Sequence, residues 1–177
     1  NLTRPELLEE IHREYIAAGS QIIYANTFGA NARKLAPTGH GAEEVVTQAV
    51  RIARKAAEGT ETLVAVDMGP LGELLEPMGS LSFEEAYNLF REVAMAGARA
   101  GADLAVIETM TDLYEAKAAL LAVKENTDLP VLVTLSFETG GRTFTGCTIP
   151  SMARTLEGLG ADAIGLNCSL GPDLLLP

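Results

Sequence analysis

The stretch that decides the fold is Ala163-Ile164-Gly165-Leu166-Asn167-Cys168-Ser169-Leu170-Gly171-Pro172. It begins with a short apolar run of the kind found in buried strands, and a Gly-Pro turn closes it. Cys168 therefore stands where the strand is expected to end. Because ligands bind beyond the carboxyl ends of the strands in parallel α/β folds, this stretch predicts a thiol beside a binding site.

The composition is that of a globular domain with an excess of acidic groups. The chain has 177 residues, 47% hydrophobic and 21% charged, enough for one domain with a sizeable core. Its net charge of -11 disfavours nucleic acid as a partner. We expect neither a membrane span, which needs roughly 20 apolar residues, nor a signal peptide. Two distant cysteines make no disulfide framework, which favours a reducing, cytoplasmic location.

Strand and helix candidates alternate along the chain. The expected strands cover residues 21–27, 62–68, 104–109, 130–137 and 163–168, and the expected helices cover 3–18, 42–57, 82–100, 112–127 and 149–158. The strand starts are separated by 41, 42, 26 and 33 residues. These are the spacings of βαβ units, so the sequence predicts a parallel sheet.

The links between these elements differ in length on the two sides of the predicted sheet. Each link from helix to strand is short and, at Gly19, Gly101 and Gly160, carries a glycine that stops the helix. Most links from strand to helix are long. This asymmetry is typical of a (β/α)8 barrel with its site on the long-loop face. A doubly wound open sheet is the alternative, although no G-x-G-x-x-G motif follows a strand.

The length argues for part of such a barrel. A complete barrel takes about 250 residues, whereas this sequence begins at a helix and supplies five strands. We expect a partial TIM-type barrel of about five βα units, with the first strand and the last units missing. Residues 1–177 would then be a single domain, the central part of a barrel truncated at both ends.

The sequence resembles the homocysteine S-methyltransferase family in segments that follow one order. They are Asn1-Leu2-Thr3-Arg4-Pro5, His12-Arg13-Glu14-Tyr15, Asn26-Thr27-Phe28-Gly29-Ala30, Gly69-Pro70, Gly101-Ala102-Asp103, Ile107-Glu108-Thr109, Gly141-Arg142-Thr143 and Gly165–Pro172. The similarity is closest to the N-terminal, homocysteine-binding domain of cobalamin-dependent members. It implies a zinc-dependent methyl transfer to homocysteine that gives methionine. It also implies methylcobalamin as the donor and separate cobalamin and folate domains as partners.

The resemblance implies that zinc is held by three cysteines, of which Cys168 matches the first. The tandem cysteine pair that supplies the others has no counterpart in the 177 residues. A thiol with a pKa of about 8.5 is mostly protonated at neutral pH, and zinc with an open coordination position binds it as thiolate. Two alternatives stay open. One is a betaine or S-methylmethionine donor, and the other is a barrel fragment that is inert by itself.

The remaining candidates lie at the ends of strands. Glu108 follows an apolar run, where a carboxylate is costly to bury without a partner. The resemblance implies that it binds the amino group of homocysteine; a surface or helix-capping role is the alternative. Asn26, Thr27 and Phe28 form either a pocket wall or a turn. Asn167 either lines the pocket or orients the cysteine loop.

Four further residues carry weaker signals. Asp67 precedes a Gly-Pro turn, and we expect it to hold that loop rather than to face the site. Cys147 is expected to be an ordinary loop thiol. His12 lies on the face of an outer helix and His40 in a glycine-flanked loop, so we expect neither to bind a metal.

Overall fold

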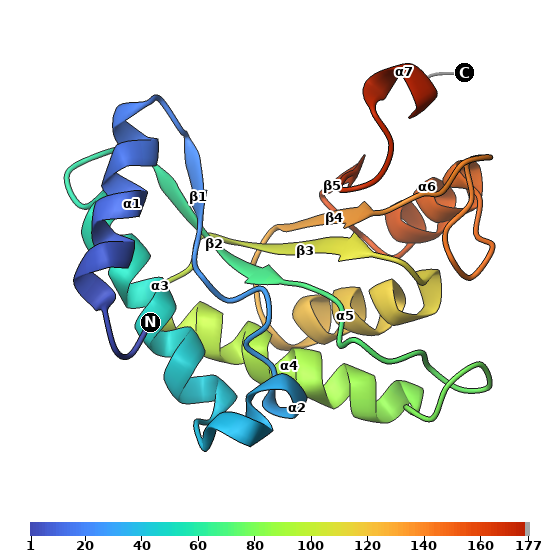
Figure 1. The fold of residues 1–177 in the computed structure, drawn as a ribbon, viewed down its shortest axis with the longest axis horizontal. Coiled ribbons are helices and arrows are strands. Elements are labelled where there is room, and N and C mark those ends of the chain that lie inside the picture. Colours follow the sequence, from blue (N-terminus) through green and yellow to red (C-terminus); the bar gives the residue numbers. More distant parts are fainter. Residues whose placement is uncertain (176–177) are drawn as a thin grey trace.

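Five parallel strands form one sheet in the computed structural model, which describes residues 1–175 (Figure 1). The sheet order follows the chain: β1 (Ile22–Tyr24), β2 (Leu63–Met68), β3 (Leu104–Met110), β4 (Val131–Leu135) and β5 (Ala163–Leu166). Every neighbouring pair is parallel. The structure therefore has the parallel βα order that the spacing predicts.

Helices connect the strands. They are α1 (Pro5–Ala17), α2 (Ala32–Leu35), the 3-10 helix η1 (Ala36–Thr38), α3 (Ala42–Ala57), α4 (Phe83–Ala100), α5 (Leu113–Asn126), α6 (Ile149–Gly158) and α7 (Pro172–Leu175). The segment 28–41, expected to be a loop, contains α2 and η1. Here the Asn31 side chain caps α2 by accepting a hydrogen bond from the Lys34 backbone N–H. None of the helices within residues 1–175 is long and apolar enough to cross a membrane.

The helix ends follow local chemistry with one exception. Ser82 and Glu85 form a capping box at the start of α4. Gly101 ends that helix with φ 95°, in the left-handed region that glycine adopts most readily. The exception is α1, where Arg4 is at the cap position and no side chain makes the cap. Pro5, at the start of this helix, lacks the N–H that would need a partner there.

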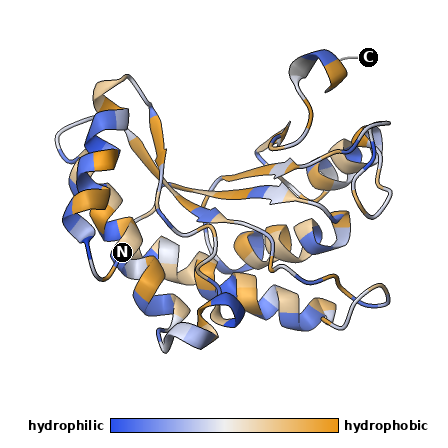
Figure 2. Cartoon of the chain, viewed as in Figure 1, coloured by the Kyte–Doolittle hydropathy of each residue, from blue (hydrophilic) through white to orange (hydrophobic). Residues whose placement is uncertain are grey.

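One face of the sheet is packed against α3, α4 and α5. Alternate strand residues point to this helix-covered face, and all of them on β1 to β4 are buried: Ile23, Val64, Val66, Met68, Ala105, Ile107, Val131, Val133 and Leu135. The contact is close, since a Cβ added at Gly97 of α4 would lie 2.7 Å from Val66 atoms. Figure 2 shows apolar residues along the strands and on the helices below them.

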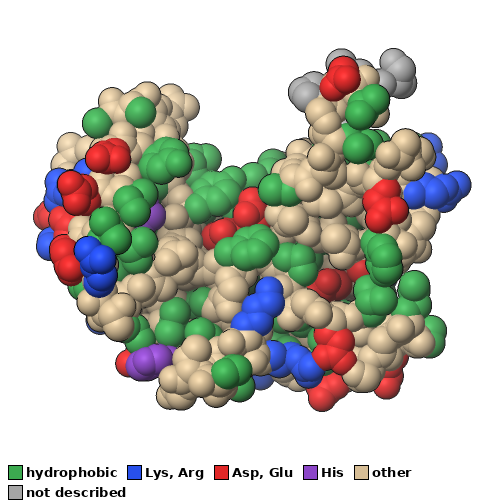
Figure 3. Space-filling model, in the orientation of Figure 1, with side chains coloured by type: hydrophobic (Ala, Val, Ile, Leu, Met, Phe, Trp, Pro, Cys, Tyr) green, Lys and Arg blue, Asp and Glu red, His purple; other side chains and the backbone are tan. Residues whose placement is uncertain are grey.

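The opposite face, here called the open face, carries the other half of the strand residues. Its outer parts are accessible: Ile22 is 42% exposed, Tyr24 39% and Leu63 44%. In the space-filling view this side is hollowed between α1 and the arm formed by β5 and α7 (Figure 3). The described residues leave this face without a second helical layer, so the side chains at its carboxyl end reach the hollow.

Candidate functional site

Polar side chains gather at the carboxyl end of the open face. Parallel register aligns Tyr24 with Ala65, Asp67 with Val106, and Thr134 with Gly165. Because side chains alternate along a strand, Tyr24, Asp67, Glu108 and Thr134 point to the same side of the sheet. Acidic side chains are visible at the floor of the hollow (Figure 3). The amino end of the same face is apolar. The polar groups are therefore confined to the carboxyl end of the open face, here called the rim.

A β-bulge in β3 lies next to Glu108. The pairing of β3 with β4 runs regularly to Ile107 and resumes at Met110, with a register shift between them. Thr109 lies in that interval with φ 62°, a conformation that is rare for a β-branched residue. Bulges of this kind occur beside active sites, where they redirect a side chain. Alternation from Ile107 already places Glu108 on the open face, and the bulge after it lets Met110 as well as Ile107 be buried.

The Asn167 side chain links three strands at this rim. Its Oδ1 accepts hydrogen bonds from the Thr109 backbone N–H (3.1 Å) and the Thr134 hydroxyl (3.0 Å). Its Nδ2 donates to Thr109 Oγ1 (2.9 Å) and Glu108 Oε2 (3.3 Å). The amide therefore holds the unusual backbone of Thr109 and orients the carboxylate of Glu108. These contacts are made to Glu108, Thr109 and Thr134, and the two roles predicted for Asn167, in the pocket wall or in orienting the cysteine loop, stay predictions.

Cys168 follows directly and has the second unusual backbone among the described residues. Its φ is 51°, and its side chain is exposed and free of a disulfide. A thiol in this position is a donor that zinc accepts. Within residues 1–175, however, no three His, Cys, Asp or Glu side chains are grouped closely enough to hold a metal ion. The described residues thus present one exposed thiol at this rim and no complete set of metal ligands.

Burial makes the carboxyl groups of the rim less acidic. Asp67 is 6% exposed, and burial together with the negative charge of Glu108 raises its pKa to about 8. Burial also raises the pKa of Glu108. The pKa of Tyr24 is raised by burial, by Glu108 and by Asp67. The negative charge of Glu108 therefore raises the pKa of both Asp67 and Tyr24, and the rim favours a cationic ligand.

The segment 26–28 divides between the site and the loop. Asn26 is exposed and lines a groove of about 590 Å³ between α1 and β1, together with Tyr24 and Asp67. Thr27 is buried, and its hydroxyl accepts from the Asp67 N–H (2.9 Å) and donates to the Asp67 carbonyl (2.8 Å). The Phe28 ring lies against Gly69, where an added Cβ would be 2.4 Å away. Asn26 thus faces the groove, while Thr27 and Phe28 hold the loops together.

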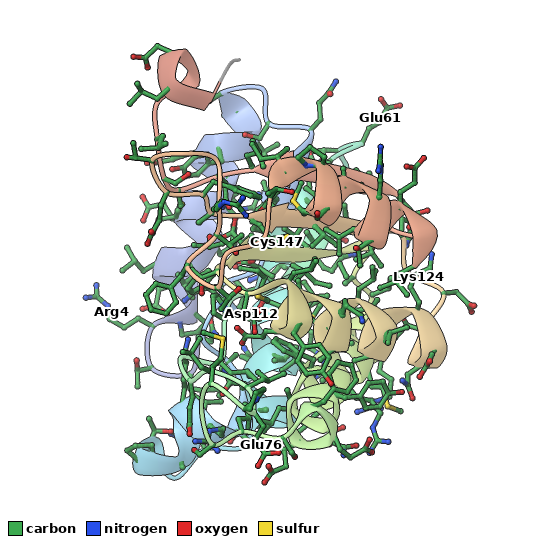
Figure 4. The ribbon with its side chains drawn as sticks, turned by 90° about the vertical axis from the view of Figure 1, so that its right-hand side faces the viewer. Arg4, Glu61, Glu76, Asp112, Lys124 and Cys147 are labelled. Atoms are coloured by element: carbon green, nitrogen blue, oxygen red, sulfur yellow. The ribbon has the colours of Figure 1, made fainter. Side chains whose placement is uncertain are left out.

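Cys147 and His40 lie in other loops, whereas His12 lines the groove between α1 and β1. Cys147 lies in the β4–α6 loop near Asp112, as Figure 4 shows, and its Sγ donates to the Thr148 carbonyl (3.3 Å). Burial raises the pKa of the Cys147 thiol. His12 is buried on α1, and the exposed His40 ring lies 3.1 Å from Glu44. The non-ligand roles expected for these three residues stay predictions.

Sequence reasoning missed three members of the rim. Tyr24 and Thr134 reach it only because of strand register, and Thr109 only because of the bulge. Asp67 was expected to hold the loop, and its backbone does so through Thr27, but its side chain points to the open face. The available signal was a single carboxylate inside the apolar strand 63–68, which is costly to bury without a purpose.

Comparison with known proteins identifies a family match over the whole sequence. The homocysteine S-methyltransferase family profile matches residues 1–177. Methionine synthase from Mycobacterium leprae (strain TN) is 34% identical over 184 residues, which cover 97% of this chain and 15% of that protein. Methionine synthase from Mycobacterium tuberculosis (strain ATCC 25618 / H37Rv) is 33% identical with the same coverage. The chain thus spans about a seventh of the length of these relatives.

Solved structures agree on the fold. The metallated form of the homocysteine methyltransferase MmuM from Escherichia coli superposes with a TM-score of 0.87 at 23% identity, covering 98% of this chain and 66% of MmuM. The apo form superposes with a TM-score of 0.79 at 24% identity, covering 98% and 65%. This likeness, with the parallel order of the strands, confirms the predicted partial (β/α)8 barrel.

Proposed function

The chain belongs to the homocysteine S-methyltransferase family, and we propose that residues 1–177 form the central part of a barrel that methylates the sulfur of homocysteine to give methionine. The observation that carries this proposal is the contact between Glu108 and Asn167 at the carboxyl end of the sheet, with Cys168 next in sequence. It brings a carboxylate for an ammonium group and a thiol for a metal to the same rim of the sheet. The barrel would be completed by strands outside this sequence.

In this proposal the rim residues bind and orient homocysteine. Glu108 accepts hydrogen bonds from the substrate ammonium group, which supplies the positive charge that its partly buried carboxylate lacks. Asn167 holds Glu108 from β5, and through Thr109 and Thr134 it fixes the spacing of three strands. Asn26 forms part of the groove wall. Thr27 and Phe28 contribute by positioning the two loops above β1 and β2.

Cys168 is proposed as one of three thiolate ligands of zinc, the other two lying outside this sequence. The support is its exposed side chain at the end of β5 and the preference of zinc for sulfur donors. When bound, zinc would hold the substrate sulfur as thiolate, which is far more nucleophilic than a thiol. The left-handed backbone of Cys168 is a strained conformation of the kind that clusters at functional sites.

We propose methylcobalamin, on a separate domain, as the methyl donor, with cobalamin and folate domains as partners in the same protein. The support is the greater sequence similarity to methionine synthases, at 34% and 33%, than to MmuM, at 24% and 23%. Betaine and S-methylmethionine are the alternative donors. Assays of the protein with each of the three donors distinguish these possibilities directly.

The two cysteines provide a matched test in the full-length protein. We expect Cys168→Ala to reduce homocysteine-dependent demethylation of methylcobalamin by at least about 100-fold, as loss of a metal ligand does. Cys147→Ala removes the other thiol, in the β4–α6 loop beside Asp112, and should leave turnover within about twofold. Undiminished turnover in Cys168→Ala would refute the assignment of this residue as a ligand.

Measurement of bound zinc distinguishes this proposal from the alternative that the chain is an inert barrel fragment. The full-length protein should hold one zinc that Cys168→Ala loses, whereas the 177-residue chain should hold none tightly, because it offers one thiol at the rim. One tightly bound zinc in the 177-residue chain would require other ligands, with Cys147 the first to test.

A further inference from the structure

Asp67 has a buried carboxyl oxygen for which the described residues offer no partner. The residue is 6% exposed on the open face of β2, and within residues 1–175 its Oδ1 accepts no hydrogen bond. Its structural contacts are made by the backbone, whose N–H and C=O both bond to the Thr27 hydroxyl. A buried polar atom without a partner in a folded protein requires an explanation, and a ligand atom is one.

The groups around Asp67 favour a positively charged ligand. Asp67 lines the groove between α1 and β1 with Tyr24, Asn26 and His12, and the described residues that line it include no Lys or Arg. Burial lowers the pKa of His12, which disfavours its cationic form. The charged group that acts on Asp67 is Glu108, on the same face of the adjacent strand. Two carboxyl groups side by side without a cation repel each other, and a positively charged hydrogen-bond donor relieves that repulsion.

The pKa values are consistent with a site that binds a cation. Burial and Glu108 raise the pKa of Asp67 to about 8, so that at neutral pH Asp67 is largely protonated when no ligand is bound. The unliganded rim therefore avoids holding two negative charges. An ammonium group between the two carboxyls would favour both ionised forms and would displace the proton to solvent.

We propose that Asp67 is a second ammonium-binding residue, which together with Glu108 accepts the N–H donors of the amino group of the substrate amino acid. This inference rests on the proposed function and adds a specificity role for a residue on β2. An ammonium group has three donors, and two carboxylates on adjacent strands satisfy two of them. A substrate that has the thiol and the carboxylate but lacks the amino group gains nothing from Asp67.

The test compares homocysteine with 4-mercaptobutanoate, which has the same chain, thiol and carboxylate but no amino group. In the full-length protein, Asp67→Asn should raise the Kd of homocysteine, measured by titration calorimetry, by about 10- to 100-fold. It should change the Kd of 4-mercaptobutanoate by less than about twofold. The values of kcat/KM should follow the same pattern. Asp128→Asn, an exposed aspartate before β4 at the other end of the sheet, is the matched control.

Glu108→Gln supplies a second measurement that does not depend on the folding of an Asp67 variant. It should remove only part of the preference for homocysteine over the desamino compound, because Asp67 still accepts one donor. Complete loss of that preference in Glu108→Gln would overturn the role of Asp67, as would an equal weakening of both ligands by Asp67→Asn. Failure of the unchanged protein to bind homocysteine would instead overturn the proposed function.

Discussion

The two faces of the sheet differ in what their residues do. The helix-covered face consists of apolar side chains that are buried throughout β1 to β4 and touch α3, α4 and α5. The open face has exposed apolar residues at its amino end and interacting polar groups at its carboxyl end, including Asp67, Glu108 and Thr134. Neighbouring residues of one strand therefore serve different purposes. Stability depends chiefly on one face and ligand chemistry on the other.

The largest effect should come from the helix-covered face. Ile107→Ala should lower the free energy of unfolding by about 2–5 kcal/mol, because Ile107 is fully buried and its removal leaves a cavity. Leu132→Ala, on the open face of the next strand, should cost less in the 177-residue chain, since Leu132 is only partly buried. Urea denaturation measures both. Equal costs in that chain would contradict the distinction between the faces.

The next effect concerns pH and contrasts one buried carboxyl on each side of the sheet. Burial raises the pKa of Asp67 to about 8 and that of Glu115, on α5, to about 7. Since both protons are held more tightly in the folded state, stability should fall as pH rises from about 4 through these values. Each group contributes at most about 1.4 kcal/mol per pH unit to the fall in the free energy of unfolding.

Substitution separates the two contributions. Asp67→Asn should remove most of the fall in stability between pH 7 and 8, because Asp67 is the more protonated of the two groups there. Glu115→Gln should remove the smaller part of that fall and act mainly below pH 7. In the second variant the amide oxygen can still accept the Leu71 N–H that Glu115 Oε1 accepts at 2.6 Å. Urea denaturation at pH 5, 6, 7 and 8 provides the measurement. An unchanged slope in Asp67→Asn would show that this carboxyl does not titrate as described.

A smaller effect should follow from removing the amide that links the strands of the open face. Asn167→Ala removes the closer acceptor of the Thr109 backbone N–H, at 3.1 Å, and leaves only the Thr134 hydroxyl at 3.4 Å, at a cost of about 1 kcal/mol. Asn167→Asp keeps that acceptor but replaces the donor to Glu108 by a second carboxylate. We expect faster hydrogen exchange at the Thr109 amide in the first variant and weaker homocysteine binding in both. Protection of that amide unchanged in Asn167→Ala would contradict the bridging role.

The smallest effect should come from the outer surface of the helical layer. Arg99 on α4 pairs with Glu43 on α3 at 2.8 Å, and both side chains are more than half exposed. Because exposed ion pairs contribute little, Arg99→Ala should change the free energy of unfolding by less than about 0.5 kcal/mol. A cost comparable with that of Ile107→Ala would mean that ion pairs, rather than apolar contacts, hold the helices to the sheet.

Local signals made much of the fold predictable. The helices at 42–57 and 149–158 have the expected bounds, and Gly19, Gly101 and Gly160 all have positive φ between helix and strand. Caps and stops of this kind depend on neighbouring residues, so the sequence contains them. The strand ends were less predictable. β1 covers three residues instead of the expected seven, because strand length depends on which partner residues lie alongside.

The candidate site was predictable only in part. Cys168 and Glu108 were identifiable because each ends an apolar run, where such a side chain is conspicuous. The bulge at Thr109 and the contacts of Asn167 join residues 58 positions apart, so no local pattern contains them. Asp67 was interpreted from its turn alone, and the orphaned oxygen that points to a ligand emerged only when the neighbouring strands were in place.

The amino-acid sequence by itself determined the alternation of strands and helices, the parallel sheet and the location of the thiol at a strand end, since periodicity, spacing and turn chemistry are local properties. The tertiary structure decided which side chains share the open rim and which of them lack a partner. Register and burial set those relations, and both arise only when strands far apart in the chain pack side by side.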